Sequence, residues 1–197
     1  MTLTNKYENQ YWSTNNLVLG IDEVGRGPLC GPLVVAGVVL PINYSNDNIK
    51  DSKKLSYKKI EELYNIIIKD AISYYIEIIP PKQIDQLNIY QATKQGMINI
   101  INKSSINIIL VDAIKIESKL TIHSIVKGDQ QSISIAAASI IAKYTRDNIM
   151  IEYHKQYPNY GYHKHKGYPT KEHLIALNTY GLNPLYRLSY KPCQKYL

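Results

Sequence analysis

Four acidic residues occupy positions where their carboxylates could act together. Asp22 and Glu23 end an apolar run in "LVLGIDEVGRGP", and Asp112 ends the run "SINIILVDA". Ligands of open α/β sheets bind beyond the carboxyl ends of strands, so two such strands could bring their acids to one edge. Each acid alone could instead end its strand in a solvated turn.

The fourth acid, Asp147, lies on a stripe of residues at helical spacing. The stripe consists of Ile133, Ala137, Ile140, Tyr144, Asp147 and Ile151. A carboxylate on the buried face of a helix is costly unless it is paired or binds a metal ion. An ion pair with Lys143 or Arg146, or a place at the rim of that face, is the alternative.

Close together, these four carboxylates would have to hold protons or cations. Two of them about 4 Å apart repel by roughly 4 kcal/mol at an intermediate effective dielectric. Hard oxygen ligands without Cys or His suit Mg²⁺ or Mn²⁺ rather than zinc. Two such ions about 4 Å apart could activate a water and stabilise the leaving oxygen of a phosphodiester. The pattern therefore indicates a nuclease-type site.

Short apolar runs and longer periodic segments predict the elements that would position these acids. We expect strands at residues 17–22, 33–40 and 73–80, in "SINIILVDA" and in "TIHSIV". Helices are expected in "DSKKLSYKKIEELYNIIIKDA" with Ser56 as N-cap, in "NIYQATKQGMINIINK", from Ser132 to about Gln156, and in "PTKEHLIALNTYG" between Thr170 and Gly181. Strands mixed with helices predict an α/β fold, a mixed sheet with helices on its faces.

The chain is expected to divide into three parts. Residues 1–16 form an N-terminal extension, residues 17–155 the catalytic domain, and residues 156–197 a small helical C-terminal segment. A chain of 197 residues is long enough to bury one substantial core.

Composition limits the classes of partner and compartment. The net charge of +7 and the isoelectric point near 9.2 favour a polyanion such as nucleic acid, although a merely basic protein would look the same. Cys30 and Cys193 form no metal-type pair, which suits a reducing compartment. The N-terminus lacks the apolar core of a signal peptide, and the run 33–40 is too short for a membrane helix. We expect a cytoplasmic monomer that does not associate with a membrane and has no obligate protein partner.

Several motifs together resemble those of one family. "GIDEVGRGPLCGPLVVAGVVL", "DSKKLS", "VDA", "KGDQQSISIAAASIIAKYTRD" and "HKGYPT" are similar, in this order, to the signature blocks of bacterial ribonuclease HII. The resemblance implies a ribonuclease H-like sheet and an endoribonuclease that cleaves the RNA strand of RNA–DNA hybrids. It also implies nicking 5′ of single ribonucleotides embedded in duplex DNA, which leaves 3′-hydroxyl and 5′-phosphate ends.

The same resemblance assigns roles to particular residues. The four family carboxylates, which hold two metal ions, correspond to Asp22, Glu23, Asp112 and Asp147. The loop Gly25, Arg26 and Gly27 would contact the ribonucleotide, with backbone groups reading the 2′-hydroxyl that distinguishes RNA from DNA. Tyr168 would stack on the sugar at the RNA–DNA junction, and Lys53 and Lys54 would contact phosphates. A tight turn at Gly25–Gly27 and a solvated helix start at Lys54 remain the alternatives.

The chain departs from the family at a few positions. Val24 and Cys30 stand where alanine is common, Ala113 where glycine is frequent, and Tyr186 where histidine often occurs. The last departure puts the contacts of the C-terminal segment in question and leaves the chemistry intact.

Four histidines gather near the C-terminus, namely His154, His163, His165 and His173. They could form a zinc site or, with neighbouring lysines, a basic surface facing the substrate. Two other functions also fit the acids and the charge: a metal nuclease of similar architecture acting on branched DNA, and a nucleic-acid-binding protein without catalysis.

Overall fold

A mixed five-stranded sheet forms the centre of the molecule. The computed structural model describes residues 5–49 and 55–197. The strand order is β3-β2-β1-β4-β5, with bounds β1 Leu19–Val24, β2 Leu33–Val39, β3 Ser73–Ile79, β4 Ile108–Asp112 and β5 Thr121–Ile125. Strands β1, β2 and β3 pair antiparallel, whereas β4 pairs parallel with both β1 and β5. The α/β fold class expected from the sequence is confirmed.

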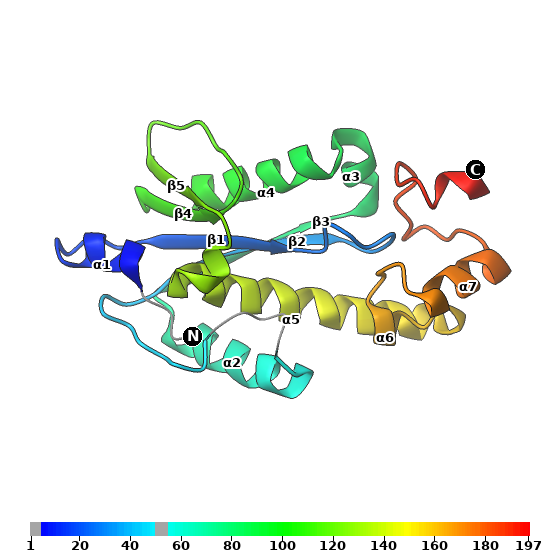
Figure 1. Ribbon diagram of the computed structural model, residues 1–197, viewed down its shortest axis with the longest axis horizontal. Helices are drawn as coiled ribbons and strands as arrows, with labels where there is room; N and C mark the ends of the chain where they lie inside the picture. The colour runs from blue at the N-terminus through cyan, green and yellow to red at the C-terminus, as the bar shows by residue number, and fades with distance from the viewer. Residues whose placement is uncertain (1–4, 50–54) are drawn as a thin grey trace.

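Helices cover both faces of this sheet. In Figure 1, α4 and α3 lie above the sheet, and α5 and α2 lie below it. The helix bounds are α1 Lys6–Trp12, α2 Tyr57–Asp70, α3 Pro81–Leu87, α4 Ile89–Lys103, α5 Ile133–Gln156, α6 Tyr162–His165 and α7 Lys171–Tyr180. Among the described residues, short 3₁₀ turns cover Gly128–Gln130, Pro158–Tyr160 and Gln194–Tyr196.

Strand β2 shows why both faces must be covered. Val34, Ala36 and Val38 belong to the core on the α5 side, and Leu33 and Val35 belong to the core on the α4 side. Alternate side chains of a strand point to opposite faces, so an entirely apolar strand needs a layer on each side.

Helix α5 packs closely on β1 because β1 contains Gly20. A Cβ at Gly20 would lie 2.2 Å from the carbonyl carbon of Ser134. Helix α5 can therefore lie directly against the backbone of the strand that carries Asp22. This contact brings the residues of α5 alongside the end of β1.

The predicted helix starts are confirmed by their capping hydrogen bonds. Ser56 accepts from the Lys59 amide, Ser132 from the Ile135 amide and Thr170 from the His173 amide. A side-chain oxygen at the N-cap satisfies an amide that has no partner within the helix.

Sequence patterns did not reveal helices α1, α3 and α6. The strand expected at residues 73–80 ends at Ile79, and Pro80 and Pro81 follow it. In the structure Pro81 is also the first residue of α3, a position where proline is favoured because no amide hydrogen bond is lost there.

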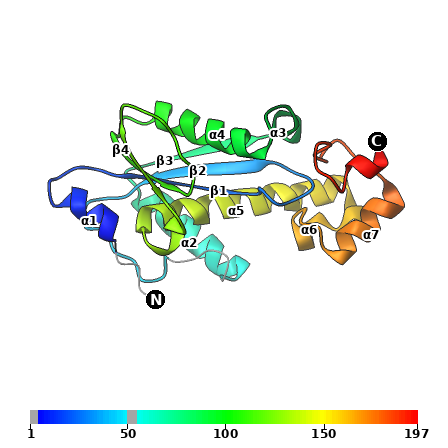
Figure 2. The same cartoon turned by 45° about the horizontal axis from the view of Figure 1, so that its top comes forward.

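The C-terminal helices form a separate layer at one end of α5. Their buried cluster includes Tyr160, Tyr162 and Leu177, together with Leu29 from the loop after β1 and Met150 from α5. Figure 2 shows α6, α7 and the C-terminal turn gathered beyond the end of the sheet. Within residues 5–49 and 55–197, no helix has both the length and the apolar character needed to cross a bilayer.

Candidate active site

Asp22 lies at the centre of the proposed acidic site. It is 4% exposed, near the end of β1, and its Oδ1 accepts a hydrogen bond from the Glu23 amide at 2.7 Å. A side-chain hydrogen bond from Ser139 on α5 also reaches it. Burial, followed by the negative charges of Glu23 and Asp112, raises the pKa of the Asp22 carboxyl well above its usual value.

Asp112 reaches the same edge of the sheet from β4. Strands β1 and β4 are parallel with Ile21 opposite Val111, so Asp22 and Asp112 occupy the next position on each strand. The Asp112 Oδ1 accepts from the Gly128 amide at 2.9 Å, which ties it to the turn before α5. The expected meeting of two strand-end acids is thus observed.

Ala113, which follows Asp112, is one of the positions where this chain departs from the family pattern by lacking a glycine. Ala113 has a φ of +53°, in the left-handed region where glycine is favoured. Alanine can adopt this conformation at a cost of roughly 1–2 kcal/mol. The turn that follows Asp112 thus forms with alanine in the left-handed position.

Asp147 lies on the buried face of α5, as its helical spacing predicts. It is 6% exposed, and its Oδ2 is 2.7 Å from the Lys143 Nζ. The ion pair with Lys143 named as an alternative is therefore present. Ser139, Lys143 and Asp147 follow one another at four-residue steps, so Lys143 lies one helical turn from each of the other two.

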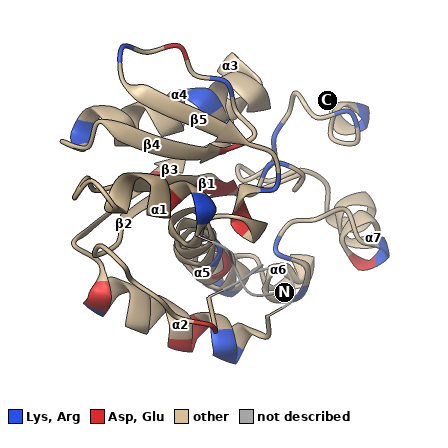
Figure 3. Cartoon of the chain, turned by 60° about the vertical axis from the view of Figure 1, so that its left-hand side comes forward, with Lys and Arg blue, Asp and Glu red and all other residues tan. Residues whose placement is uncertain are grey.

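The donor set fits a hard divalent cation, although the side chains do not enclose one in this arrangement. Across residues 5–49 and 55–197, no three His, Cys, Asp or Glu side chains are placed to hold an ion together. The pKa of Asp22 is nevertheless raised by burial and then by the nearby negative charges of Glu23 and Asp112, a setting in which a bound cation would be favoured. Figure 3 shows acidic segments (red) on β1, β4 and α5, with further red and blue segments on α2 and α7.

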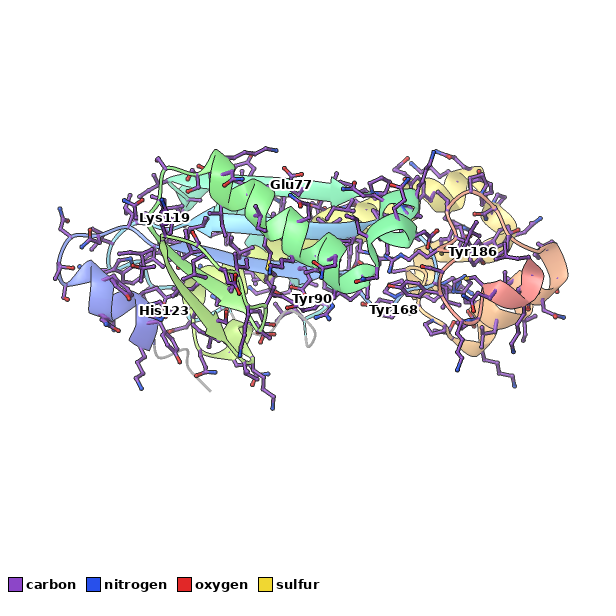
Figure 4. All side chains as sticks on the ribbon, turned by 90° about the horizontal axis from the view of Figure 1, so that it is seen from above. Glu77, Tyr90, Lys119, His123, Tyr168 and Tyr186 are labelled. Atoms are coloured by element: carbon purple, nitrogen blue, oxygen red, sulfur yellow. The ribbon has the colours of Figure 1, made fainter. Side chains whose placement is uncertain are left out.

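The loop after β1 places glycines beside Tyr168. Gly25 is buried with a φ of +101°, while Gly27 is exposed. A Cβ at Gly27 would lie 3.5 Å from Cε1 of Tyr168, so the loop and this ring are neighbours. Figure 4 shows Tyr168 where the sheet region meets the C-terminal helices. Arg26 is partly exposed, and its Nη1 is 3.3 Å from the Glu23 Oε1.

Buried Arg146 connects the loop after β1 with the segment that carries Tyr168, a role that sequence patterns did not reveal. Its Nε donates to the Pro32 carbonyl and its Nη1 to the Lys166 carbonyl, both at 2.9 Å, and its Cζ lies 5.8 Å from the Tyr168 ring centroid. Gly25 must lack a side chain because a Cβ there would be 2.4 Å from the Arg146 Nε.

The C-terminal histidines form two pairs of adjacent rings. The rings of His154 and His163 are 3.9 Å apart, and those of His165 and His173 are 4.3 Å apart. Within the described residues, these histidines are not grouped with one another or with Cys, Asp or Glu as three possible ligands of one ion.

His165 and His173 instead hold the loop that carries Tyr168. His165 Nδ1 accepts from the Gly167 amide at 3.1 Å, and His173 Nδ1 lies 2.9 Å from the Tyr168 carbonyl oxygen. His173 Nε2 lies 2.8 Å from the Tyr186 hydroxyl. Tyr186 thus takes a defined place in this network. Lys53 and Lys54 lie outside the described residues.

The sheet and the helices on its two faces form a ribonuclease H-like fold. Ribonuclease H2 from Pyrococcus horikoshii OT3 superposes with a TM-score of 0.79 at 26% identity, over 91% of this chain and 96% of that one. A structure of Bst-RNase HIII in complex with Mn²⁺ shares the fold, with a TM-score of 0.74 at 16% identity over 98% of this chain and 72% of that one.

Sequence comparison then identifies the family. The family model for ribonuclease HII matches residues 19–193. Ribonuclease HII of Francisella tularensis subsp. novicida is 50% identical over 181 residues, 90% of this chain and 98% of that protein. The chain belongs to the ribonuclease HII family and is an endoribonuclease, which hydrolyses phosphodiester bonds.

Proposed function

We propose that this protein cleaves the RNA strand of RNA–DNA hybrids and nicks duplex DNA on the 5′ side of an embedded single ribonucleotide. The products would carry 3′-hydroxyl and 5′-phosphate ends. One observation supports this substrate above all: the loop Gly25–Gly27 follows the acidic end of β1 directly and has Tyr168 beside it. A group that reads a sugar would then lie next to the groups that cleave its phosphate.

Asp22, Glu23 and Asp112 would hold Mg²⁺ or Mn²⁺, with Asp147 completing a site for two ions. Bound ions would lower the pKa of a coordinated water and stabilise the leaving oxygen. Asp22 must be ionised to act as a ligand. Burial, followed by the charges of Glu23 and Asp112, raises its pKa, and a cation bound there would offset both effects. The Mn²⁺ complex of Bst-RNase HIII, which shares the fold, is consistent with this cofactor.

The chain's own residues would orient the substrate. Ser139 holds the Asp22 carboxyl through its hydrogen bond, and Lys143 holds Asp147 on the side of α5 that faces the sheet. The exposed backbone at Gly27 would contact the 2′-hydroxyl, since glycine permits close approach to a sugar. Tyr168, which is 41% exposed, would stack on the neighbouring sugar.

The substrate would extend over the C-terminal segment. We propose that residues 17–155 form the catalytic domain and that residues 156–197 contribute to binding through Tyr168 and the basic side chains near it. The net charge of +7 supports a polyanionic partner. Lys53 and Lys54 remain predicted phosphate contacts. A monomeric, cytoplasmic enzyme whose partners are hybrids and ribonucleotide-containing DNA also remains a prediction.

An end-labelled DNA duplex with one ribonucleotide tests the proposal. The protein is incubated with it in Mg²⁺, Mn²⁺ or EDTA, alongside an all-DNA duplex, an RNA–DNA hybrid and a branched DNA junction. We expect a metal-dependent nick immediately 5′ of the ribonucleotide, cleavage of the hybrid, and an intact all-DNA duplex. The Asp112→Asn variant should bind without cleaving.

Other outcomes would contradict the proposal. Cleavage of the junction in preference to the ribonucleotide would assign a different nuclease function. Salt-sensitive binding without a nick in either metal, by protein shown to be folded, would indicate a binding protein.

A further inference from the structure

Two side chains of the C-terminal segment hold one carbonyl group of the loop after β1. Arg187 Nη1 donates to the Arg26 carbonyl oxygen at 3.2 Å, and the Tyr190 hydroxyl donates to the same oxygen at 2.6 Å. Arg187 Nη1 also donates to the Tyr190 hydroxyl at 3.0 Å. The three groups form a closed set of hydrogen bonds, which we call the Arg26 clamp.

The clamp determines which way the next amide faces. The Arg26–Gly27 peptide is trans, so its carbonyl oxygen and the Gly27 amide hydrogen point in opposite directions. Because the oxygen points toward Arg187 and Tyr190, the Gly27 N–H points away from them. Gly27 is exposed, and its missing side chain leaves the space next to the Tyr168 ring.

Arg187 is held in place by further contacts with the same loop. Its side chain is fully buried, and Nε and Nη2 both donate to the Gly31 carbonyl at 3.1 and 2.9 Å. Its own amide donates to the Leu29 carbonyl at 2.9 Å. A buried guanidinium is unfavourable unless its donors are satisfied, and here carbonyls of this loop take most of them.

The segment that carries the clamp is also fixed to the catalytic part of the chain. Asp85 in α3 accepts hydrogen bonds from the Leu188 and Ser189 amides, each at 2.9 Å. Its Oδ1 also accepts from the Ser189 hydroxyl at 2.6 Å. Residues 187–190 are thus attached both to the loop and to a helix on the sheet, so they can transmit a fixed geometry to Gly27.

We propose that Arg187 and Tyr190 are positioning residues for ribonucleotide recognition, which hold the Arg26–Gly27 peptide so that the Gly27 amide faces the 2′-hydroxyl of the substrate. This inference rests on the proposed recognition of a ribonucleotide by the loop. It assigns to the C-terminal segment a role in discriminating RNA from DNA, in addition to binding the polyanion.

The test compares binding of a duplex containing one ribonucleotide with binding of the same duplex made only of DNA. Dissociation constants are measured with Ca²⁺ in place of Mg²⁺, to separate binding from cleavage, and kcat/KM for nicking is measured with Mg²⁺. Tyr190→Phe removes one hydroxyl and keeps the ring, whereas Arg187→Lys keeps the charge and loses the branched donor group. Tyr196→Phe, in the exposed C-terminal turn, is the matched control.

We expect Tyr190→Phe to lower the preference for the ribonucleotide duplex, and kcat/KM for nicking, by about five-fold, the effect of one lost hydrogen bond. Binding of the all-DNA duplex and the melting temperature should change little, as in the control. Arg187→Lys should lower the preference further. If that variant does not fold, Tyr190→Phe alone decides the question.

An unchanged preference and nicking rate in folded Tyr190→Phe would overturn the inference. An equal loss of affinity for both duplexes would also overturn it, because it would indicate a general binding role. Failure of the proposed function looks different: the wild-type protein itself would then show neither a preference nor a nick.

Discussion

Replacing Gly25 and Gly27 by alanine, one at a time, should have opposite consequences although the two residues are neighbours in one loop. At Gly25 the backbone has a φ of +101°, which L side chains rarely adopt. A Cβ there would lie 2.4 Å from Arg146 Nε and 2.9 Å from the Pro32 carbonyl oxygen. Arg146 cannot move aside without losing its hydrogen bond to that oxygen.

The cost at Gly25 can be estimated from these two effects. Backbone strain contributes about 1–3 kcal/mol and forced overpacking a similar amount. The Gly25→Ala variant should therefore lose roughly 2–6 kcal/mol of unfolding free energy. For a chain of this size, that corresponds to a fall in melting temperature of roughly 5–20 °C.

At Gly27 the added methyl group would meet only ordinary contacts. Its nearest neighbours would be Tyr168 Cε1 at 3.5 Å and Cδ1 at 3.9 Å. We therefore expect Gly27→Ala to melt close to the wild type. The methyl group would nevertheless fill the space between loop and ring where the sugar is proposed to bind, so kcat/KM for nicking should fall by about 100-fold.

Thermal unfolding and nicking of the single-ribonucleotide duplex are measured for both variants. If Gly25→Ala has the same melting temperature as the wild type, the reasoning about Gly25 is wrong, because the loop would then have relieved the strain and the clash without loss of stability. The reasoning about Gly27 is wrong if Gly27→Ala nicks at the wild-type rate, because the sugar would then bind elsewhere.

Three further predictions follow from buried titratable groups. Because burial, followed by the charges of Glu23 and Asp112, raises the pKa of Asp22, the metal-free wild type should lose stability as pH rises above about 4 through that pKa. Asp22→Asn should lose cleavage and this pH dependence together, and a variant that still cleaves would remove Asp22 from the site. Burial lowers the pKa of His173 to about 4, so its ring should stay neutral in an NMR titration until about that pH, and folding stability should fall as pH drops from the usual histidine value toward it. A midpoint near the usual value would refute its buried role. Burial raises the pKa of Cys30 to about 12 and of Cys193 to about 11, so a thiol reagent should label them only after unfolding, and rapid labelling of the native protein would contradict this packing.

Local patterns were sufficient to predict the elements that carry the acids. Ser56, Ser132 and Thr170 each lie directly before a periodic segment and do cap a helix. Asp112 ends β4 and Asp22 lies two residues before the end of β1, and the parallel pairing of those strands brings the two acids together. These signals are visible in sequence because the residues involved are close along the chain or mark the end of an element.

Contacts between distant residues could not be predicted in this way. Helix α1 is short and lacks a clear apolar stripe, and its Glu8 is buried because it accepts a hydrogen bond from the Ser134 amide at the start of α5. Arg146 and Arg187 are of a type usually found at the surface, and their partners are backbone carbonyls distant in sequence. Every residue has a backbone carbonyl, so no sequence pattern indicated these contacts.

Helix α5 links the two halves of the proposed mechanism. Asp147 and Arg146 are adjacent in sequence, and adjacent helical residues project about 100° apart. Asp147 therefore lies with Lys143 on the side of α5 that carries Ser139. Arg146 reaches the Pro32 carbonyl at the end of the loop after β1. Because a single helix carries both residues, the fold fixes the distance between the acids proposed to cleave and the loop proposed to read the sugar. A nick at a constant position relative to the ribonucleotide would follow from this geometry.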